Sequence, residues 1–218
     1  MRTTLTLVFL IVAPAIFAQS RFMVGVSDNP NLTWGNYYSQ QTNYNISSIR
    51  HSPQIYVGAG LNIGIYLSKR FFLLTGIEGT AKAFSYKDYY ITYIDNAYDK
   101  YTVTSFSWEV PLLLNFILSK KPRRLSFFYT AGFTGGVCTS LSINKAAGVN
   151  SPPTSIIEIG NQIPNRYYLD FVWGEGCKAN LSKKFSILII PNFSYQITNL
   201  ENMKLITFTW RTMLMYNF

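Results

Sequence analysis

The chain has 218 residues, with 19 Lys and Arg against 10 Asp and Glu, and a formal net charge of +9. Charged residues make up 13% of it, about half of what is usual in soluble domains, while aromatic residues make up 17%. This composition excludes a disordered chain, and the scattered Gly and Pro exclude a coiled coil. After the N-terminus there is no run of about 18 apolar residues, which excludes a helical membrane bundle and leaves an aromatic-rich all-β chain.

The N-terminal residues 1–18 have the features of a secretory signal peptide. Arg2 supplies a positive charge, Leu5–Ile16 is mainly apolar, and Ala18 is a small residue at which cleavage before Gln19 is expected. The apolar stretch is too short for a membrane-spanning helix, and polar sequence follows it at once. We therefore expect an exported protein with a signal peptide at 1–18 and one domain at 19–218.

The rest of the chain consists of segments in which apolar and polar residues alternate. From Ile206 to Phe218 every second residue is large and apolar except Thr212, while Arg211 and its alternating neighbours lie on the other face. A period of two residues over such a length is typical of a long strand with one apolar face. The same pattern predicts eight strands, at 20–27, 54–67, 70–85, 101–118, 124–141, 166–180, 184–197 and 204–218.

The two faces of these strands indicate the class of protein. One face is apolar, and the other carries Gly, Ser, Thr and Asn with only a few charges. A soluble sandwich would carry many charges on its outer face, whereas small polar residues suit the packed interior of a narrow barrel whose apolar face meets lipid. The sequence therefore predicts an all-β fold, an eight-stranded antiparallel up-and-down transmembrane β-barrel with a side-chain-filled lumen.

Three residues depart from this pattern. Pro111 and Pro191 lie inside predicted strands and have no N–H group, so we expect a bulge or broken pairing beside each. Strict alternation places Glu175 on the lipid face, unless a bulge near Gly174 or Gly176 turns it inward.

Short and long connections alternate along the chain. The short turns share a Leu-Ser-Lys-Arg or Leu-Ser-Lys-Lys sequence, at 67–70, 118–121 and 181–184. Long polar segments separate them, at 28–53, 86–100, 142–165 and, shorter, 198–203. Short periplasmic turns and long outer loops are typical of outer-membrane barrels, so we expect the predicted polar segments to be outer loops.

The basic charge of the protein is concentrated in the short turns. Counted with the segment 122–124 that follows the second turn, they contain eight basic residues and no acid: Lys69, Arg70, Lys120, Lys121, Arg123, Arg124, Lys183 and Lys184. This equals the whole net charge of the mature chain, which has 18 basic and 10 acidic residues once Arg2 is removed. The charge therefore does not indicate nucleic-acid binding. We expect a basic rim that meets the phosphates of outer-membrane lipid.

One strand resembles a known family. Residues 108–116, Trp-Glu-Val-Pro-Leu-Leu-Leu-Asn-Phe, resemble the aromatic-x-[Ile/Val]-Pro-Leu-Leu-Leu strand of PorT-like outer-membrane β-barrels of Bacteroidota. The Gly-x-Gly run at 58–60 before a basic turn and the terminal Tyr216-Asn217-Phe218 are similar too. The resemblance implies an eight-stranded barrel in the outer membrane, with one branch of the family associated with type IX secretion. A terminal Phe also implies that Phe218 is the signal for the outer-membrane insertion machinery.

A cluster of charged side chains is expected inside the barrel. Alternation turns six of them inward: Glu78, Lys82, Glu109, Asp170, Lys178 and Arg211. An eight-stranded barrel is just wide enough to be filled by side chains, and buried charges must pair there because desolvating a lone ion is costly. We expect Arg211 to pair with Glu109 or Glu78 and the cluster to fix the core, with a proton or ion path as the alternative.

Catalytic and metal chemistry find little support in the sequence. His51, the single histidine, lies beside Ser52, but neighbours in an extended strand point in opposite directions. We expect no metal site and no cofactor, given one His and two distant Cys. Strand register keeps Cys138 and Cys177 roughly eight residues apart, far beyond disulfide reach, so two free thiols are expected.

The outer loops are rich in Tyr, a residue that suits recognition surfaces. The candidate recognition residues are Tyr37, Tyr38, Tyr44, Tyr89, Tyr90 and Tyr93. We expect a non-enzymatic, monomeric outer-membrane barrel that is structural or binds a secretion or surface partner. The alternatives are a barrel enzyme acting on outer-membrane lipid through His51 and Ser52, and a soluble lipocalin-like barrel.

Overall fold

The computed structural model of the chain describes residues 22–37, 50–91, 96–119, 124–146, 156–158, 166–198 and 203–218. The predicted signal peptide at 1–18 lies outside the described residues. The strands in the described part are β1 (Phe22–Asp28), β2 (Asn31–Tyr37), β3 (Arg50–Tyr56), β4 (Gly58–Tyr66), β5 (Phe71–Ile91), β6 (Asn96–Ile117), β7 (Leu125–Ala146), β8 (Ile156–Glu158), β9 (Tyr167–Asn180), β10 (Phe185–Gln196) and β11 (Met203–Asn217).

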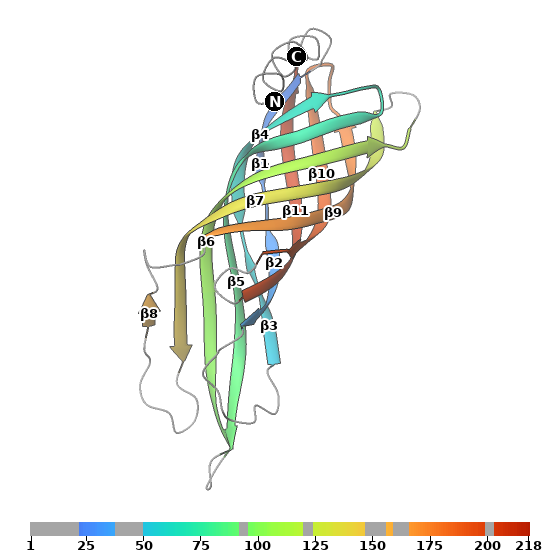
Figure 1. The fold of residues 1–218 in the computed structure, drawn as a ribbon. Coiled ribbons are helices and arrows are strands. Elements are labelled where there is room, and N and C mark those ends of the chain that lie inside the picture. Colours follow the sequence, from blue (N-terminus) through green and yellow to red (C-terminus); the bar gives the residue numbers. More distant parts are fainter. Residues whose placement is uncertain are drawn as a thin grey trace, which may run out of the picture.

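These strands close into a ring with eight positions (Figure 1). β1 continues into β2, and β3 continues into β4, so each of these pairs fills one position. The backbones of Asn29 and Gly58 exchange hydrogen bonds of 2.7 and 3.0 Å, which keeps the pairing in register between the two composite strands. β1 pairs with β11 to close the ring, and the short β8 adds to the edge of β7. The predicted eight-stranded antiparallel up-and-down barrel is confirmed.

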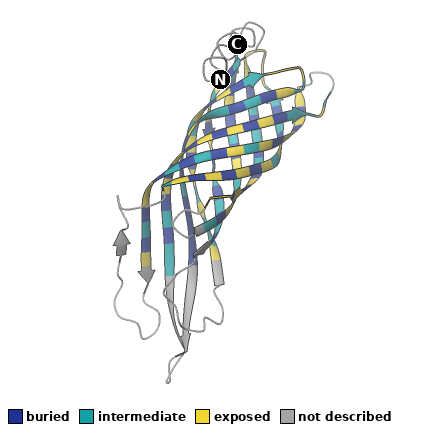
Figure 2. Ribbon diagram, in the orientation of Figure 1, coloured by how far each residue is buried: buried dark blue, intermediate teal, exposed yellow. Residues whose placement is uncertain are grey.

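Side chains alternate between the exterior and the interior of the barrel along its strands (Figure 2). The exposed side chains are mainly large and apolar, as in β9, where Phe171 and Trp173 are exposed and Val172 between them is buried. Among the described residues, more polar than apolar side chains are buried. This arrangement is the reverse of a soluble lipocalin-like barrel and is typical of a barrel that spans a lipid bilayer.

Aromatic rings on the exterior gather at two levels. Toward the long-loop end a row of rings crosses four strands, with adjacent centroids 4.9 to 5.9 Å apart: Phe133, Phe171, Trp173, Phe193 and Phe208. At the short-turn end Tyr216 lies edge-on to Phe185 and Phe218. Rings at these two levels lie where the headgroups of a bilayer would be, on either side of an aliphatic band. No helix in the described part of the chain is long and apolar enough to cross a membrane.

Two apolar clusters fill the ends of the lumen. The cluster at the short-turn end contains Met23, Phe72, Leu74, Leu113, Phe128, Val172, Leu188, Ile190, Met213 and Met215. The cluster toward the long-loop end contains Phe84, Val103, Cys138, Leu141, Ile143, Tyr168 and Leu205. Polar side chains occupy the space between them. The interior therefore has a polar layer between two apolar layers.

The repeated turn sequence produces a repeated turn structure. The N–H of Leu67 donates to the carbonyl of Phe71 at 2.9 Å, and the N–H of Leu181 donates to Phe185 at 3.0 Å. In both turns the Ser hydroxyl, of Ser68 or Ser182, accepts from the backbone N–H groups two and three residues later, at 3.0 to 3.2 Å. The Ser side chain thus satisfies donors that the tight turn leaves free.

The predicted outer loops are partly wrong. β2 and β3 occupy much of the segment predicted as a loop at 28–53, and β5 and β6 extend to Ile91 and Asn96 through the segment at 86–100. β7 extends to Ala146, inside the segment at 142–165. Outside the bilayer a strand needs no apolar face, because water solvates both sides of it. Apolar alternation therefore ends before the hydrogen-bonded ladder ends.

Pro111 and Pro191 each interrupt the pairing with one neighbouring strand without shifting the strand register. Between β5 and β6 the ladder passes from Thr75–Leu112 to Glu78–Glu109 in constant register, skipping the pairs beside Pro111. Between β9 and β10 it passes from Cys177–Ile189 to Gly174–Asn192, skipping Pro191. Each proline keeps its pairing with the strand on its other side. Broken pairing is confirmed, and the alternative of a bulge at either proline is wrong.

β7 contains a bulge at Thr139, but no bulge turns Glu175 of β9 inward. Ser107 pairs with Cys138 and Phe106 with Ser140, which leaves Thr139 as an extra residue in β7. Glu175 pairs with Tyr129 in unbroken register and is exposed on the outside of β9. The placement of Glu175 on the lipid face by strict alternation is confirmed, and the alternative of a bulge near Gly174 or Gly176 is wrong.

Candidate functional site: the charged layer inside the barrel

All six charged residues expected in the lumen are buried. Their exposed fractions are 1% for Glu78, 5% for Lys82 and Glu109, 3% for Asp170, 7% for Lys178 and 4% for Arg211. They come from four strands: β5 supplies Glu78 and Lys82, β6 supplies Glu109, β9 supplies Asp170 and Lys178, and β11 supplies Arg211. Five of them form one layer, whereas Lys178 lies apart.

Two carboxylates lie side by side at the centre of this layer. Glu78 of β5 pairs directly with Glu109 of β6 in the strand register, which brings two like charges together in a medium of low polarity. The Nη2 atom of Arg211 contacts Oε2 of Glu78 at 2.8 Å, and Nζ of Lys82 contacts Oε1 of Glu109 at 2.7 Å. Each carboxylate therefore has its own cation, and Glu78 is the partner of Arg211.

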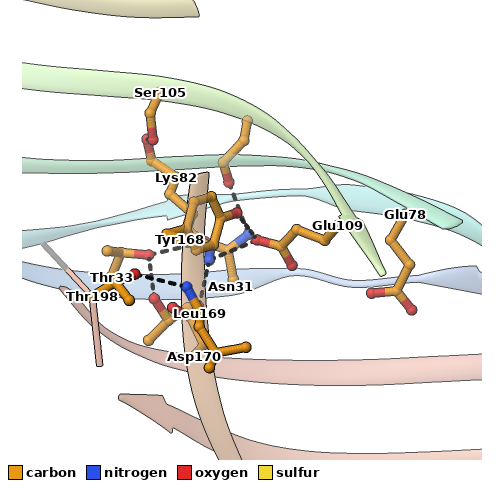
Figure 3. Close-up of polar contacts among 12 residues, drawn as sticks. Asn31, Thr33, Glu78, Lys82, Ser105, Glu109, Tyr168, Leu169, Asp170 and Thr198 are labelled. Atoms are coloured by element: carbon orange, nitrogen blue, oxygen red, sulfur yellow. Dashed lines mark hydrogen bonds and ion pairs between the residues drawn. The ribbon is translucent and has the colours of Figure 1, made fainter. Parts of the chain in front are cut away.

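In the second half of the layer, Lys82 contacts Glu109, Asp170 and Tyr168 (Figure 3). Besides Glu109, it donates to Oδ2 of Asp170 at 3.2 Å. The hydroxyl of Tyr168 donates to Oε1 of Glu109 at 2.5 Å, and the Tyr168 ring lies 5.0 Å from Nζ of Lys82. Tyr168 is missing from the predicted cluster, although it lies two residues before Asp170 and alternation turns it to the same side.

A small cavity lies between the two halves of the layer. Its volume is about 20 Å³, and its lining includes Glu78, Lys82, Asp170 and Arg211. Several buried atoms of the lining have no hydrogen-bond partner in the described protein: Oε1 of Glu78, Oγ1 of Thr80, Oδ1 of Asp170, Nε and Nη1 of Arg211, and both amide atoms of Asn29. This volume suits about one water molecule with several polar partners. The layer is a packed ion-pair network with room for hydration and no room for a substrate.

Lys178 belongs to a separate site near the short-turn end. Its ammonium donates to the hydroxyl of Tyr66 and, at 3.4 Å each, to Oδ1 of Asn217 and Sδ of Met23. Nζ also lies 5.0 Å from the centroid of the Tyr66 ring. Grouping Lys178 with the other five charges is therefore wrong. Eight residues separate it from Asp170, and an extended strand rises about 3.3 Å per residue.

The remaining candidates do not assemble into a catalytic or metal site in the described part of the chain. Ser52 is exposed on β3, and the side chain of His51 lies outside the described residues. Among the described residues no group of three or more His, Cys, Asp or Glu side chains could hold a metal ion. Cys138 and Cys177 form no disulfide in the described part of the chain, as predicted from strand register.

The side chains of the candidate recognition tyrosines all lie outside the described residues. Tyr37, Tyr89 and Tyr90 lie in strands whose backbone is described, but their side chains lie outside the described residues. Tyr38, Tyr44 and Tyr93 also lie outside them. Phe218 is 73% exposed at the short-turn end, with its ring 4.9 Å from that of Tyr216.

Comparison with known proteins finds similarity in structure alone. No protein-family model matches the sequence, and no curated protein matches it. Among solved structures, Neisserial surface protein A is 9% identical, with a TM-score of 0.48, over 90% of this chain and 97% of that chain. OprG of Pseudomonas aeruginosa is 10% identical, with a TM-score of 0.36, over 91% and 96% of the two chains.

A third similar structure is an enzyme. The outer-membrane protease OmpT of Escherichia coli is 8% identical, with a TM-score of 0.45, over 91% of this chain and 96% of that chain. Because all three TM-scores lie below 0.5, the fold assignment rests on the strand pairing and burial of this chain itself. The chain is a closed ring of eight antiparallel strands with an apolar exterior, which is the architecture of a bacterial outer-membrane barrel.

Proposed function

We propose that this chain is a non-enzymatic outer-membrane β-barrel that acts through its long-loop end or as a structural component of the membrane. The closed interior is the observation that carries this proposal. A pore, a transporter or an enzyme of the lumen needs space for water, ions or substrate. Here an ion-pair layer with a cavity of about 20 Å³ lies between two apolar clusters. The barrel therefore acts as a rigid support for what lies at its two rims.

The long-loop end offers the larger surface for a partner. β5, β6 and β7 continue beyond the aromatic row as a sheet that projects from the barrel, with β3 and β8 at its edges (Figure 1). A stiff projecting sheet holds its loops at little cost in conformational entropy, which favours binding. In the sequence, Tyr-rich segments directly follow the ends of β2 and β5, and this composition supports binding of a secretion or surface partner.

The short-turn end carries the basic rim. Lys69, Arg124, Lys183 and Lys184 are exposed there and Arg70 is half-buried, next to the lower level of aromatic rings. Cations beside rings at headgroup depth suit the phosphates of outer-membrane phospholipid. This contact would hold the short-turn end in the periplasmic leaflet, with Phe218 at the same rim as the signal for the insertion machinery.

A finer family assignment rests on the resemblance of residues 108–116 to PorT-like barrels of Bacteroidota. In the structure this segment is the part of β6 whose alternate residues, Trp108, Val110, Leu112 and Leu114, are exposed on the apolar exterior. The pattern supports a lipid-facing strand, a feature that unrelated membrane barrels share. Membership of that family, and the link to type IX secretion, are therefore proposals that the resemblance alone supports.

Recording in planar bilayers tests the closed interior. Folded protein, identified by its faster migration on gels before boiling, should give no stable conductance above the noise of the bilayer. A porin added to the same bilayer is the positive control. Stable, large channels from the purified chain would contradict the closed lumen and with it the proposed function.

A further inference from the structure

A carboxylate lies in the middle of the lipid-facing band. Asp28 is at the end of β1 and is exposed on the exterior of the barrel, whereas its neighbours Ser27 and Asn29 are buried in the lumen. It stands six residues from Phe22, where β1 begins at the short-turn rim. In a strand tilted by about 40° this distance corresponds to roughly 15 Å along the membrane normal, near the centre of an apolar band about 25 Å tall.

The side chains around Asp28 are apolar or small. Register places Thr212 of β11 directly opposite it on one side and Ala59 of β4 on the other. The diagonal positions are filled by exposed apolar side chains, which are Val57, Leu61, Trp210 and Leu214. The carboxylate of Asp28 makes no ion pair or hydrogen bond with a described residue. The carboxylate is therefore surrounded by surface that meets lipid tails.

A lipid-exposed carboxylate at this depth is costly unless something other than lipid covers it. Hydrocarbon offers no donor, and the aliphatic band between the two aromatic levels contains no basic side chain among the described residues. Another protein surface is the partner that can both supply a donor and exclude lipid. Small residues such as Ala59 at such a face let a second backbone approach closely, as they do at helix contacts in membranes.

We propose that the face over β11, β1 and β4, centred on Asp28 and Thr212, is the interface with a second copy of this chain. Asp28 and Thr212 lie side by side on the exterior, as a cross-strand pair. A two-fold axis along the membrane normal, passing between them, places Asp28 of each copy opposite Thr212 of the other, with an offset in depth of roughly 3 Å because the strands are tilted by about 40°. Each Thr hydroxyl then donates to the carboxylate across the interface, so the face is complementary to itself.

This inference rests on the membrane-spanning orientation of the barrel and replaces the monomer expected from the sequence. A heterologous contact would need a donor elsewhere on the band at the depth of Asp28. The other lipid-facing carboxylate, Glu175, is three ring positions away on β9 and lies beside Tyr129 and Pro191. It has a bulky ring and a proline beside it in place of Thr and Ala, so a second copy cannot approach there as closely.

Sedimentation equilibrium in density-matched detergent micelles tests the proposal, after the gel shift has shown that each sample is folded. The wild-type chain should form dimers. Asp28→Leu and Thr212→Val should each raise the dissociation constant about tenfold, since two reciprocal hydrogen bonds are lost in each variant. The double variant should be no weaker than either single one. Glu175→Leu and Thr75→Val change a carboxylate and a hydroxyl elsewhere on the exterior, and should leave association unchanged.

Disulfide trapping locates the interface independently. In a Cys138→Ala, Cys177→Ala background, Val26→Cys next to the axis should cross-link to itself in native membranes. Leu114→Cys, equally lipid-facing on the opposite side of the ring, should not. A folded wild-type chain that is monomeric, or a dimer that Asp28→Leu and Thr212→Val leave unchanged, would overturn the proposal. Cross-linking of Val26→Cys only to a different protein would overturn it as well. An unfolded chain that never enters micelles would instead contradict the barrel orientation.

Discussion

The central residues of the interior are two carboxylates that the fold places next to each other. Glu78 and Glu109 are directly paired across β5 and β6, so neither could remain charged in this layer without a cation of its own. Arg211 supplies one cation from β11. Lys82 supplies the other from β5, four residues after Glu78 and on the same face of the strand. The network ties β5, β6, β9 and β11 together through the lumen and fixes their mutual positions.

Removing one partner of an ion pair in this network should lower the free energy of unfolding, whereas removing both partners of the same pair should lower it much less. Arg211→Met leaves Glu78 buried without a cation, and should lower the free energy of unfolding by about 3–5 kcal/mol. Adding Glu78→Leu should restore much of the loss, because both members of the ion pair are then replaced by apolar side chains. Adding Glu109→Leu in place of Glu78→Leu should not restore it, since that carboxylate belongs to Lys82.

The measurement is urea unfolding in lipid or detergent, followed by the gel shift. A silent Arg211→Met variant, or equal rescue by Glu109→Leu and Glu78→Leu, would show that the ion pair of Arg211 with Glu78 does not hold the layer.

Alternation in the sequence predicts which charged side chains face the lumen, but not which of them meet. Inward orientation follows from a period of two, so it holds for Arg211 and Glu78 whatever the shape of the barrel. The partner of Arg211 depends on how far β11 is staggered against β5 across the lumen, and no local pattern determines that stagger. Inward orientation also leaves depth along the barrel open, and depth separates Lys178 from the layer, because it lies eight residues from Asp170 on the same strand.

A row of three residues across β6, β7 and β9 explains how Tyr168 reaches this network. Glu109 pairs with Gly136, and Gly136 pairs with Tyr168. Because Gly136 has no side chain, the Tyr168 ring crosses the middle strand and places its hydroxyl on Glu109. A Cβ atom added at Gly136 would lie 2.2 Å from Cζ of Tyr168, too close for any real contact, whereas one added at Gly135 would meet nothing within 4 Å.

Gly136→Ala should therefore destabilise the barrel, and the adjacent Gly135→Ala should not. The methyl group at 136 displaces the Tyr168 ring and removes its hydrogen bond to Glu109, at a cost of about 1–3 kcal/mol. The change at 135 points outward and should stay within about 0.5 kcal/mol of wild type. Unfolding midpoints of the two variants, measured side by side, check this. Equal stability of the two would mean that the row is not packed as described.

At the level of the strands, prediction from sequence succeeded where one face meets lipid. All eight predicted strands exist, because the bilayer imposes apolar alternation on each of them. It failed at the ends of β5, β6 and β7 and in β2, where strand residues such as Asn31 and Thr33 are polar like a loop. Asp28 lies in the segment predicted as a loop for this reason, whereas the pairing of β1 with β4 and β11 places it in the lipid-facing band.

For the whole molecule, the decisive property is which face of the barrel is apolar. All four Trp residues, Trp34, Trp108, Trp173 and Trp210, occur at outward positions of their strands, and three of them are more than 40% exposed. The interior, by contrast, holds the ion pairs and most of the buried polar groups. A soluble fold could not leave so much aromatic surface in water, so the barrel requires lipid around it.

Quenching of Trp fluorescence by brominated phospholipids tests this requirement directly. Folded protein in vesicles with bromine on the acyl chains should lose most of its Trp emission relative to unbrominated vesicles, because lipid-facing indoles lie within contact distance of the chains. Acrylamide in the aqueous phase should quench the same sample only weakly. Emission that brominated lipid leaves unchanged and acrylamide quenches strongly would place the indoles in water and contradict a barrel that spans the membrane.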